Sequence, residues 1–109
     1  MSDMVTMRDF KKLQIRIGTV AEVERVPGSR NLYKLQVDIG DETRQIVTGL
    51  VDYYTEEELE GKVIAVLTNL KPARIFGQMS NGMLLAAEAG DKLALLTVDR
   101  EIPKGARIT

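Results

Sequence analysis

Apolar and polar residues alternate strictly from residue 33 to residue 39, and this is the clearest pattern in the chain. Every odd position there is Tyr, Leu, Val or Ile, and every even position is polar. A period of two is typical of a strand that buries one face. A Gly-Asp-Glu turn follows, so residues 43–48 are predicted to return as the second strand of a hairpin.

Residues 14–26 precede this hairpin and are rich in Ile and Val. They predict a first strand, and the lone Gly18 inside it favours a bulge or a sharp bend, as at the corner of a barrel. The Pro-Gly-Ser sequence at 27–29 is a turn signal that separates this strand from the next.

The second half of the chain predicts shorter strands. Residues 63–67 form a continuous apolar run, residues 69–82 have the composition of a loop, and residues 83–87 are apolar again. We therefore expect a fourth strand, a long loop and a fifth strand. Residues 93–97 favour one more short strand, and a turn-rich tail over 99–105 follows it.

Two capping boxes predict two short helices. Thr6 is followed three residues later by Asp9, and Thr55 is followed at the same spacing by Glu58. In each pair the Thr hydroxyl and the carboxylate satisfy backbone N–H groups of a first helical turn. The helices are expected to run to residue 12 and over residues 56–60.

The predicted order is three strands, a short helix, two strands and an appendage. We predict an all-β fold, a five-stranded Greek-key barrel of the OB-fold type, with a short helix between strands 3 and 4. A short N-terminal helix and a C-terminal strand-containing extension complete it. An SH3-like barrel would accommodate the strands, but the helix favours the OB-fold. Residues 1–109 are expected to be one domain, with its core at about 13–87 and an extension at about 88–109.

Composition excludes most catalytic chemistry. The 109 residues include neither cysteine nor histidine, so thiol catalysis, zinc fingers and the commonest general base are absent. No Gly-rich phosphate loop occurs, and the glutamates at 56–58 and 60 are explained by helix capping. We expect no cofactor, no bound metal and no independent enzymatic activity. The longest apolar runs have five residues, which is too short to cross a bilayer, and we expect a cytoplasmic protein.

The near-neutral net charge of −1 hides an uneven distribution. No acidic residue occurs between Glu24 and Asp38 or between Glu60 and Glu88, and these two windows hold six of the fifteen basic residues. They overlap the loops at 25–32 and 69–82, which correspond to the loops with which OB-folds bind oligonucleotides. Such gaps also arise by chance, so charge alone does not distinguish RNA binding from an ordinary charge distribution.

Three stretches resemble one family closely. Asp9-Phe10 leads into Ile-Arg-Ile-Gly-Thr-Val at 15–20, and Arg-Gln-Ile-Val-Thr-Gly-Leu occupies 44–50. Asn-Leu-Lys-Pro-Ala-Arg occupies 69–74, followed by Gly77 and by Ser-Asn-Gly-Met-Leu-Leu-Ala-Ala at 80–87. These motifs resemble the tRNA-binding domain found at the C-terminus of methionyl-tRNA synthetases and as free-standing dimers. The tail at 96–105 is most similar to the synthetase version.

The resemblance implies a non-catalytic module that increases the tRNA affinity of methionyl-tRNA synthetase, in cis or in trans, with little sequence specificity. Its partners would be tRNA, a second copy of the chain and the catalytic chain of the synthetase. It also implies contacts from Asn69, Lys71, Arg74, Ser80 and Met83. The cations would neutralise phosphates, the polar side chains would bond base edges or 2′-hydroxyls, and Met83 would pack on an unstacked base.

The first loop departs from the family pattern. Many members carry Asp-Lys-Leu where this chain has Arg30, Asn31 and Leu32. The missing lysine charge is expected to come from Arg30 or Lys34, with Asn31 beside them. Phe76 and Tyr33 are candidate stacking platforms, although with five aromatic residues in the chain both are better explained as anchors of the fold.

Two further expectations concern partners. A secretion-chaperone branch of the same family binds peptides, and it is the alternative function. The extension is too apolar to remain solvated, which favours a homodimer in which it packs on a twofold-related copy. Its apolar residues are Leu93, Leu95, Leu96, Val98, Ile102 and Ile108.

Overall fold

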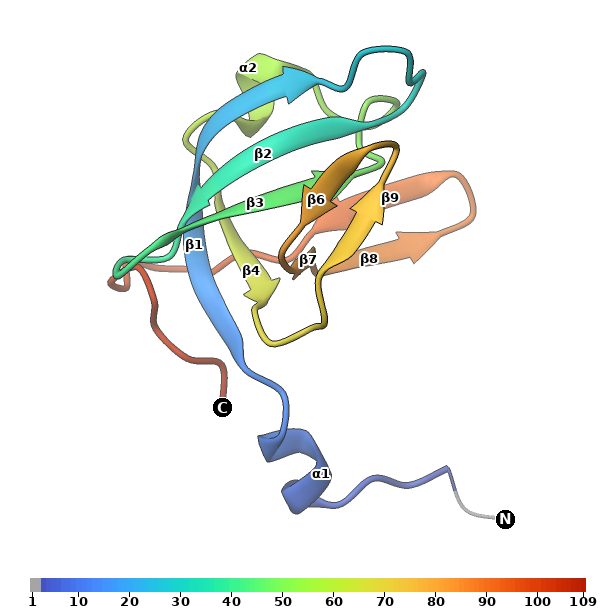
Figure 1. Ribbon diagram of the computed structural model, residues 1–109. Helices are drawn as coiled ribbons and strands as arrows, with labels where there is room; N and C mark the ends of the chain where they lie inside the picture. Colours follow the sequence, from blue (N-terminus) through green and yellow to red (C-terminus); the bar gives the residue numbers. More distant parts are fainter. Residues whose placement is uncertain (1–2) are drawn as a thin grey trace.

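Five antiparallel strands wrap into a nearly closed barrel in the computed structural model, which describes residues 3–109 (Figure 1). Their order is β3-β2-β1-β4-β7, so the chain crosses from β3 to β4 over the end of the barrel. The helix α2 occupies that crossing, which confirms the predicted OB-type topology. The bounds are α1 Met7–Lys11, β1 Ile15–Arg25, β2 Tyr33–Asp38, β3 Thr43–Thr48, α2 Glu56–Leu59, β4 Val63–Leu67 and β7 Met83–Leu84.

Both helices begin as the sequence predicts. The Thr6 hydroxyl accepts from the backbone N–H of Asp9, and the Asp9 carboxylate accepts from the backbone N–H of Thr6. Thr55 and Glu58 make the same reciprocal pair at the start of α2. Both capping boxes are confirmed.

Strand β1 is shared between two neighbours, which gives the barrel its corner. Its first half pairs with β4 from Ile15 to Thr19, and its second half pairs with β2 from Thr19 to Arg25. The register shifts between Val20 and Glu22, so the predicted irregularity lies slightly beyond Gly18. Gly18 itself permits close packing, because a Cβ there would lie 2.7 Å from Cγ1 of Val37.

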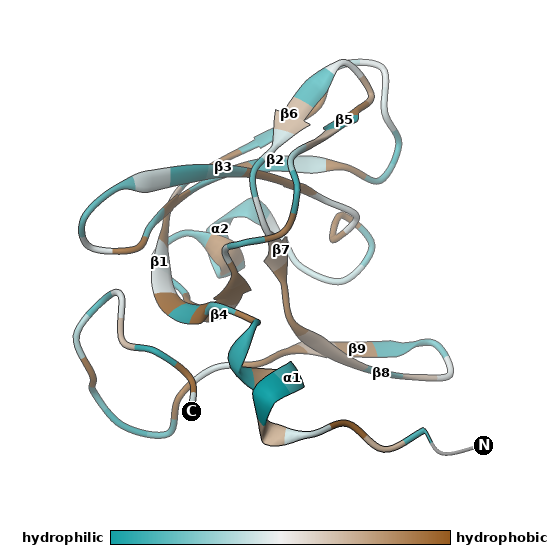
Figure 2. Ribbon diagram, turned by 60° about the horizontal axis from the view of Figure 1, so that its bottom comes forward, coloured by the Kyte–Doolittle hydropathy of each residue, from teal (hydrophilic) through white to brown (hydrophobic). Residues whose placement is uncertain are grey.

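The barrel core consists of the inward residues of these strands. Leu35, Val37 and Ile39 of the alternating segment are fully buried, and Leu59 of α2 closes one end of the barrel. Figure 2 shows the apolar colour concentrated along the strands. A second cluster lies outside the barrel wall, where Ile15 and Ile17 are covered by Phe10, Val98 and Ile108.

Three parts of the second half differ from the prediction. The expected loop at 69–82 contains a hairpin, β5 Ala73–Ile75 and β6 Gln78–Ser80. The expected strand at 83–87 divides at Leu85, with β7 pairing β4 and β8 Ala86–Ala89 pairing β9 Lys92–Leu95. The last strand ends two residues earlier than predicted. The backbone of Leu96 leaves the hairpin, where its N–H donates to the carbonyl of Leu85 and its carbonyl accepts from the N–H of Ala65.

Barrel closure between β3 and the β6–β7 segment depends on a side chain. The backbone N–H of Asn81 donates to the carbonyl of Gln45 at 2.7 Å. One residue away, the backbone N–H of Val47 donates to Oγ of Ser80 at 3.0 Å. The Ser80 hydroxyl thus replaces a backbone acceptor in this seam.

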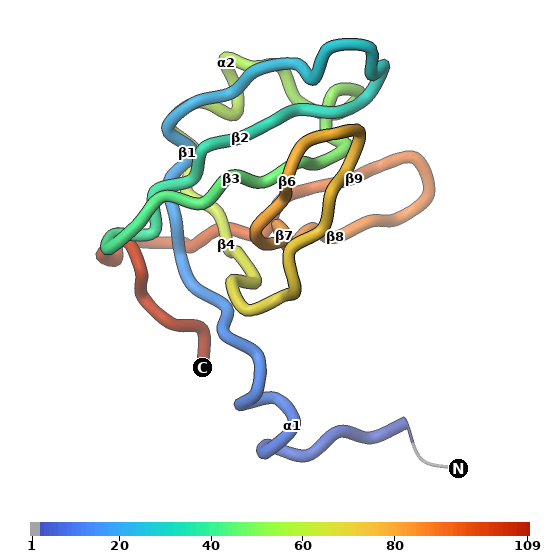
Figure 3. Tube along the Cα trace, viewed as in Figure 1, coloured from blue at the N-terminus to red at the C-terminus, as the bar shows by residue number. Residues whose placement is uncertain are grey.

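Residues 105–108 cover the edge of β1 that β2 leaves open. The backbone N–H of Ile17 donates to the carbonyl of Ala106, and the N–H of Ile108 donates to that of Ile15. Gly105 has a φ of 87° and approaches so closely that a Cβ would lie 2.6 Å from the carbonyl oxygen of Ile39. The N-terminal helix α1 and the C-terminal residues lie on one side of the molecule, away from the β1–β2 loop (Figure 3).

Candidate nucleic-acid interface

The β1–β2 loop is held in one shape by its own hydrogen bonds. The hydroxyl of Ser29 accepts from the backbone N–H groups of Asn31 and Leu32 at 3.3 and 3.1 Å. The guanidinium of Arg25 donates to the carbonyl of Arg30 at 3.1 Å. Arg25, Arg30 and Asn31 are all exposed on this ordered loop.

The β5–β6 hairpin lies against the barrel beside this loop. The side-chain amide of Gln45 donates to the carbonyl of Met79 at 2.8 Å, so β3 holds one strand of the hairpin. At its tip, Phe76 and Gly77 have φ values of 52° and 81°, as the two central residues of a tight primed turn do. A Cβ on Gly28 would lie 3.3 Å from the Phe76 ring, so the hairpin tip reaches the β1–β2 loop.

We call the surface formed by residues 25–32, residues 70–80 and Met83 the loop face. Lys71 and Arg74 are exposed there, and Met83 is 45% exposed. The Arg74 guanidinium donates to the carbonyl of Gly77 at 3.3 Å and so stays near the hairpin tip. A groove of about 140 Å³ runs between β3 and this segment, lined by Leu70, Lys71, Ile75 and Met83 among others.

The cation of Lys34 is partly compensated. Its ammonium lies 3.1 Å from a carboxylate oxygen of Glu24 and 3.5 Å from the amide oxygen of Gln78, and its side chain is 23% exposed. Lys34 therefore joins β2 to the hairpin and lies at the edge of the loop face. Its positive charge is less available to a phosphate than those of Lys71 and Arg74.

Two predicted contact residues already have intramolecular partners. The amide of Asn69 accepts from the backbone N–H of Gln14 at 2.8 Å and donates to the carbonyl of Lys12 at 2.7 Å. Ser80 is 4% exposed, and its hydroxyl donates to the carbonyl of Gly82 as well as accepting from Val47. These bonds give Asn69 and Ser80 the role of fixing the segment that carries Lys71 and Met83.

One basic residue of the acid-free windows lies elsewhere. Lys62 precedes β4, at the end of that strand opposite to Asn69, and its ammonium lies 5.6 Å from the centroid of the Tyr54 ring. It lines a different cavity, described below. The acid-free windows therefore do not place all six of their basic residues at the two loops.

The two candidate aromatic platforms differ in exposure. Tyr33 is 4% exposed, its hydroxyl donates to the carbonyl of Tyr54 at 2.8 Å, and burial raises its pKa. It is an anchor of the core, as expected. Phe76 is 58% exposed, contrary to the anchoring role that the sequence favoured. The sequence signal for this hairpin tip is the Phe76-Gly77 pair, which lies between two groups of three residues, 73–75 and 78–80, that are compatible with strands.

A second surface with exposed apolar side chains lies at the chain ends. We define the terminal face as α1, Leu13 and residues 96–109. Met7, Leu13 and Ile102 are 65%, 42% and 50% exposed there, and a groove of about 340 Å³ separates α1 from Arg107 and Ile108. Unlike the loop face, this surface carries both charge signs, with Asp9, Asp99 and Glu101 among its acids.

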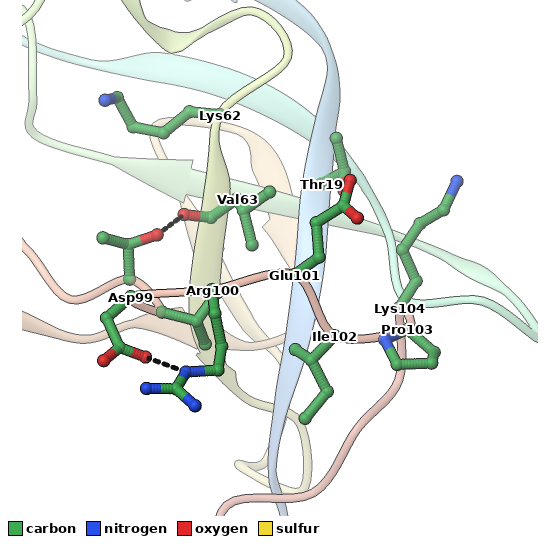
Figure 4. A pocket seen from close by; sticks show the side chains of 11 residues that line it. Thr19, Lys62, Val63, Asp99, Arg100, Glu101, Ile102, Pro103 and Lys104 are labelled. Carbon is green, nitrogen blue, oxygen red and sulfur yellow. Dashed lines mark hydrogen bonds and ion pairs between the residues drawn. The ribbon is translucent and has the colours of Figure 1, made fainter.

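A further cavity of about 870 Å³ lies between the strand wall and residues 97–104 (Figure 4). Arg100 pairs with Asp99 at 3.4 Å, but both side chains are more than four-fifths exposed. Over residues 3–109, no group of three or more acidic residues is placed to hold a metal ion. Within the same part of the chain, no helix is long and apolar enough to cross a membrane.

Comparisons with known proteins agree on one family. The family model described as "Putative tRNA binding domain" matches residues 15–107. A methionine–tRNA ligase of Thermotoga maritima is 53% identical over 105 residues, which are 96% of this chain but 17% of the ligase.

Solved structures extend the likeness to whole chains. A protein of Pyrococcus horikoshii described as MetRS related superposes with a TM-score of 0.93 and 41% identity over 99% of this chain and 100% of its own. The chaperone CsaA of Bacillus anthracis superposes with a TM-score of 0.88 and 30% identity over 97% of this chain and 99% of its own.

Proposed function

The chain belongs to the tRNA-binding domain family, and from this premise we propose that it binds tRNA on the loop face without catalysing a reaction. The observation that carries the proposal is the position of Lys71 and Arg74. Both are exposed on the segment between β4 and β6, next to the ordered β1–β2 loop with Arg25 and Arg30. None of the ion pairs within residues 3–109 involves any of these four cations.

The arrangement suits recognition of a backbone rather than of a base sequence. Phosphate contacts supply affinity that does not depend on base sequence. We place these contacts where the loop face has cations and no acidic residues. We assign phosphate contacts to the four cations Lys71, Arg74, Arg25 and Arg30, with Lys34 and Asn31 at the margin. Met83 packs on an unstacked base, and Asn69 and Ser80 act by holding this segment in place.

A salt series with labelled tRNA tests the electrostatic part. Four available cations predict a slope of roughly −3 to −4 in a plot of log affinity against log salt concentration. The Lys71→Ala/Arg74→Ala variant should lower that slope by roughly 1.5 to 2 and weaken binding to every tRNA alike. A salt-independent affinity, or unchanged binding by the double variant, would contradict the proposal.

We further propose that the module raises the tRNA affinity of a methionine–tRNA ligase, in cis or in trans. The likeness to a ligase of which it spans 17% supports this. Adding the chain to a ligase catalytic chain should lower the KM for tRNA and leave the KM for methionine unchanged. An equal effect on both constants would point to a general activation instead.

The terminal face supports a homodimer. Its exposed side chains Met7 and Leu13 line the groove beside α1, and the exposed Ile102 adds apolar area on the same C-terminal segment as Arg107 and Ile108. A self-complementary interface there would leave both loop faces free for one tRNA. Sedimentation equilibrium should give twice the 12.1 kDa mass of the chain. A mass of one chain at micromolar concentration would contradict the dimer.

The likeness to the CsaA chaperone favours a second candidate, the binding of unfolded peptides. The groove of about 140 Å³ beside Leu70 and Met83 is the apolar surface that such a peptide would need. Competition separates the two functions. Peptide that displaces tRNA from the loop face at similar concentration would favour the chaperone function, whereas displacement by RNA alone would favour tRNA binding.

A further inference from the structure

The tip of the β5–β6 hairpin carries an unusual residue for its backbone. Phe76 has a φ of 52°, and it is the one described residue other than glycine with a positive φ among residues 3–109. A bulky side chain is disfavoured there, and Asn, Asp or Gly normally occupies this position of a primed turn. Because the backbone at this position disfavours phenylalanine, the reason for its presence must lie in what its side chain does.

Packing in the core does not explain it. The Phe76 side chain is 58% exposed, more than Leu70, Met79 or Met83 on the same face. A residue retained for the core would be buried, as Tyr33 is. The strained backbone therefore presents an aromatic ring to the outside of the molecule.

The ring is nevertheless held in place. It lies against Gly28, whose φ of 83° and missing side chain leave room for it, since a Cβ there would be 3.3 Å from Cε2 of Phe76. Gln45 and Lys34 tie the strand β6 behind it to the barrel. A ring that is held next to Gly28 and is more than half exposed can accept a flat ligand with little rearrangement.

Cations without acidic partners lie on the two segments that meet at the ring. The Arg74 guanidinium bonds to the carbonyl of Gly77, the residue next to Phe76. Arg25 and Arg30 belong to the loop that supports the ring. A flat, uncharged group attached to a negatively charged backbone matches this combination, and a nucleotide of single-stranded RNA has both features.

We propose that Phe76 is a stacking platform for one unpaired nucleobase of the RNA bound to the loop face. The proposal rests on the proposed function and adds to it a preference of the site for RNA with unpaired bases. Stacking is tolerant of base identity, because every base has a flat face. The platform therefore selects for single-stranded structure rather than for sequence.

The first test uses Phe76→Asn, which suits the backbone better than phenylalanine does. Thermal stability should stay equal or rise, while tRNA affinity should fall about fivefold or more, as for the loss of one stacked base. The salt slope should not change, because no phosphate contact is lost. A blunt RNA duplex of equal phosphate number is the matched control ligand, and its affinity should not change.

The second test uses fluorescence. The chain has no tryptophan, so Phe76→Trp introduces a single reporter at the platform. This variant should keep its affinity for tRNA, and an oligouridylate should quench its emission on binding. Quenching by unfolded peptide but not by RNA would overturn the proposal.

The outcomes separate this proposal from the proposed function. If Phe76→Asn binds tRNA as the unmodified chain does while Lys71→Ala/Arg74→Ala loses binding, stacking is overturned and tRNA binding stands. If Phe76→Asn loses affinity for the duplex as strongly as for tRNA, Phe76 only positions the loops and the platform is overturned. If the unmodified chain binds no RNA at any salt concentration, both proposals fail.

Discussion

The loop face and the terminal face both expose large apolar side chains, but they differ in the charges around them. Phe76 and Met83 on the loop face have cations nearby within sequence windows free of acids. Met7 and Ile102 on the terminal face lie among charges of both signs. Exposed apolar area alone indicates only that something binds. From the sign of the surrounding charge we propose a polyanion as the partner of the loop face and another protein surface as the partner of the terminal face.

Reversing charges on the loop face should give the largest effect. Lys71→Glu/Arg74→Glu is expected to weaken tRNA binding by about 3 kcal/mol, or roughly two orders of magnitude in Kd, at about 1.5 kcal/mol per charge-assisted contact. The control Lys62→Glu/Lys92→Glu changes the net charge equally at sites outside both the loop face and the terminal face. Fluorescence anisotropy with labelled tRNA measures both. Equal losses would mean that net charge, rather than the loop face, determines affinity.

Charges introduced on the terminal face should act on assembly instead. Met7→Glu/Ile102→Glu would bury two carboxylates in the proposed dimer interface, and its dissociation constant should rise by about thirtyfold or more, an effect of about 2 kcal/mol. Sedimentation equilibrium is the measurement. Leu70→Glu places one carboxylate on a loop-face residue that is 46% exposed and should leave the mass unchanged. Dissociation of the dimer by Leu70→Glu would mean that the interface lies on the loop face and not on the terminal face.

A third variant separates a structural residue from the binding residues around it. Ser80→Ala removes the acceptor of the buried Val47 N–H, so the free energy of unfolding should fall by about 1–3 kcal/mol. Urea denaturation measures this loss, and the tRNA affinity of the folded fraction should fall much less than that of Lys71→Ala/Arg74→Ala, because Ser80 holds the segment without contacting tRNA. Thr97→Ala is the comparison, since its hydroxyl donates to Val63 from an exposed position and should cost less. A large loss of affinity with intact stability would restore Ser80 as a contact residue.

The smallest effect is expected from pH. Lys104, which lies 2.9 Å from a carboxylate oxygen of Asp38, lowers the pKa of that carboxyl together with the backbone N–H of Gly40. A lowered folded-state pKa gives stability that is complete above the unfolded value of about 4 and is lost as the pH falls through the folded value. Asp38→Asn should remove this part of the acid dependence of the melting temperature. Glu88→Gln, at an exposed position in β8, should not.

Local signals in the sequence were sufficient for the first half of the fold. The capping boxes and the alternation of β2 each depend on residues within one element, and they were confirmed at nearly the predicted bounds. The hairpin β5–β6 was missed because its turn is Phe-Gly rather than Asn-Gly and its strands have three residues each. Short strands of mixed polarity give no periodic signal.

The sequence predicted where the cations of the candidate site lie, but it did not predict the hydrogen bonds of the polar residues beside them. Lys71 and Arg74 are exposed where the acid-free window placed them. Ser80 and Asn69 find partners 33 and 55 residues away, so their hydrogen bonds depend on the closed barrel and not on neighbouring sequence. The exposure of Phe76 likewise depends on a turn that the pattern did not show.

The pairing of residues 105–108 with β1 has a consequence for how the protein is made. Arg16 and Gly105, which bond across this seam, are 89 residues apart, so a ribosome completes the first strand long before its covering segment exists. During that interval one edge of β1 can template pairing with another nascent chain. Closing a loop of this length also costs conformational entropy, and this cost slows folding. We therefore expect the yield of folded protein to depend on how quickly residues 105–108 are synthesised and to fall steeply when translation pauses before them.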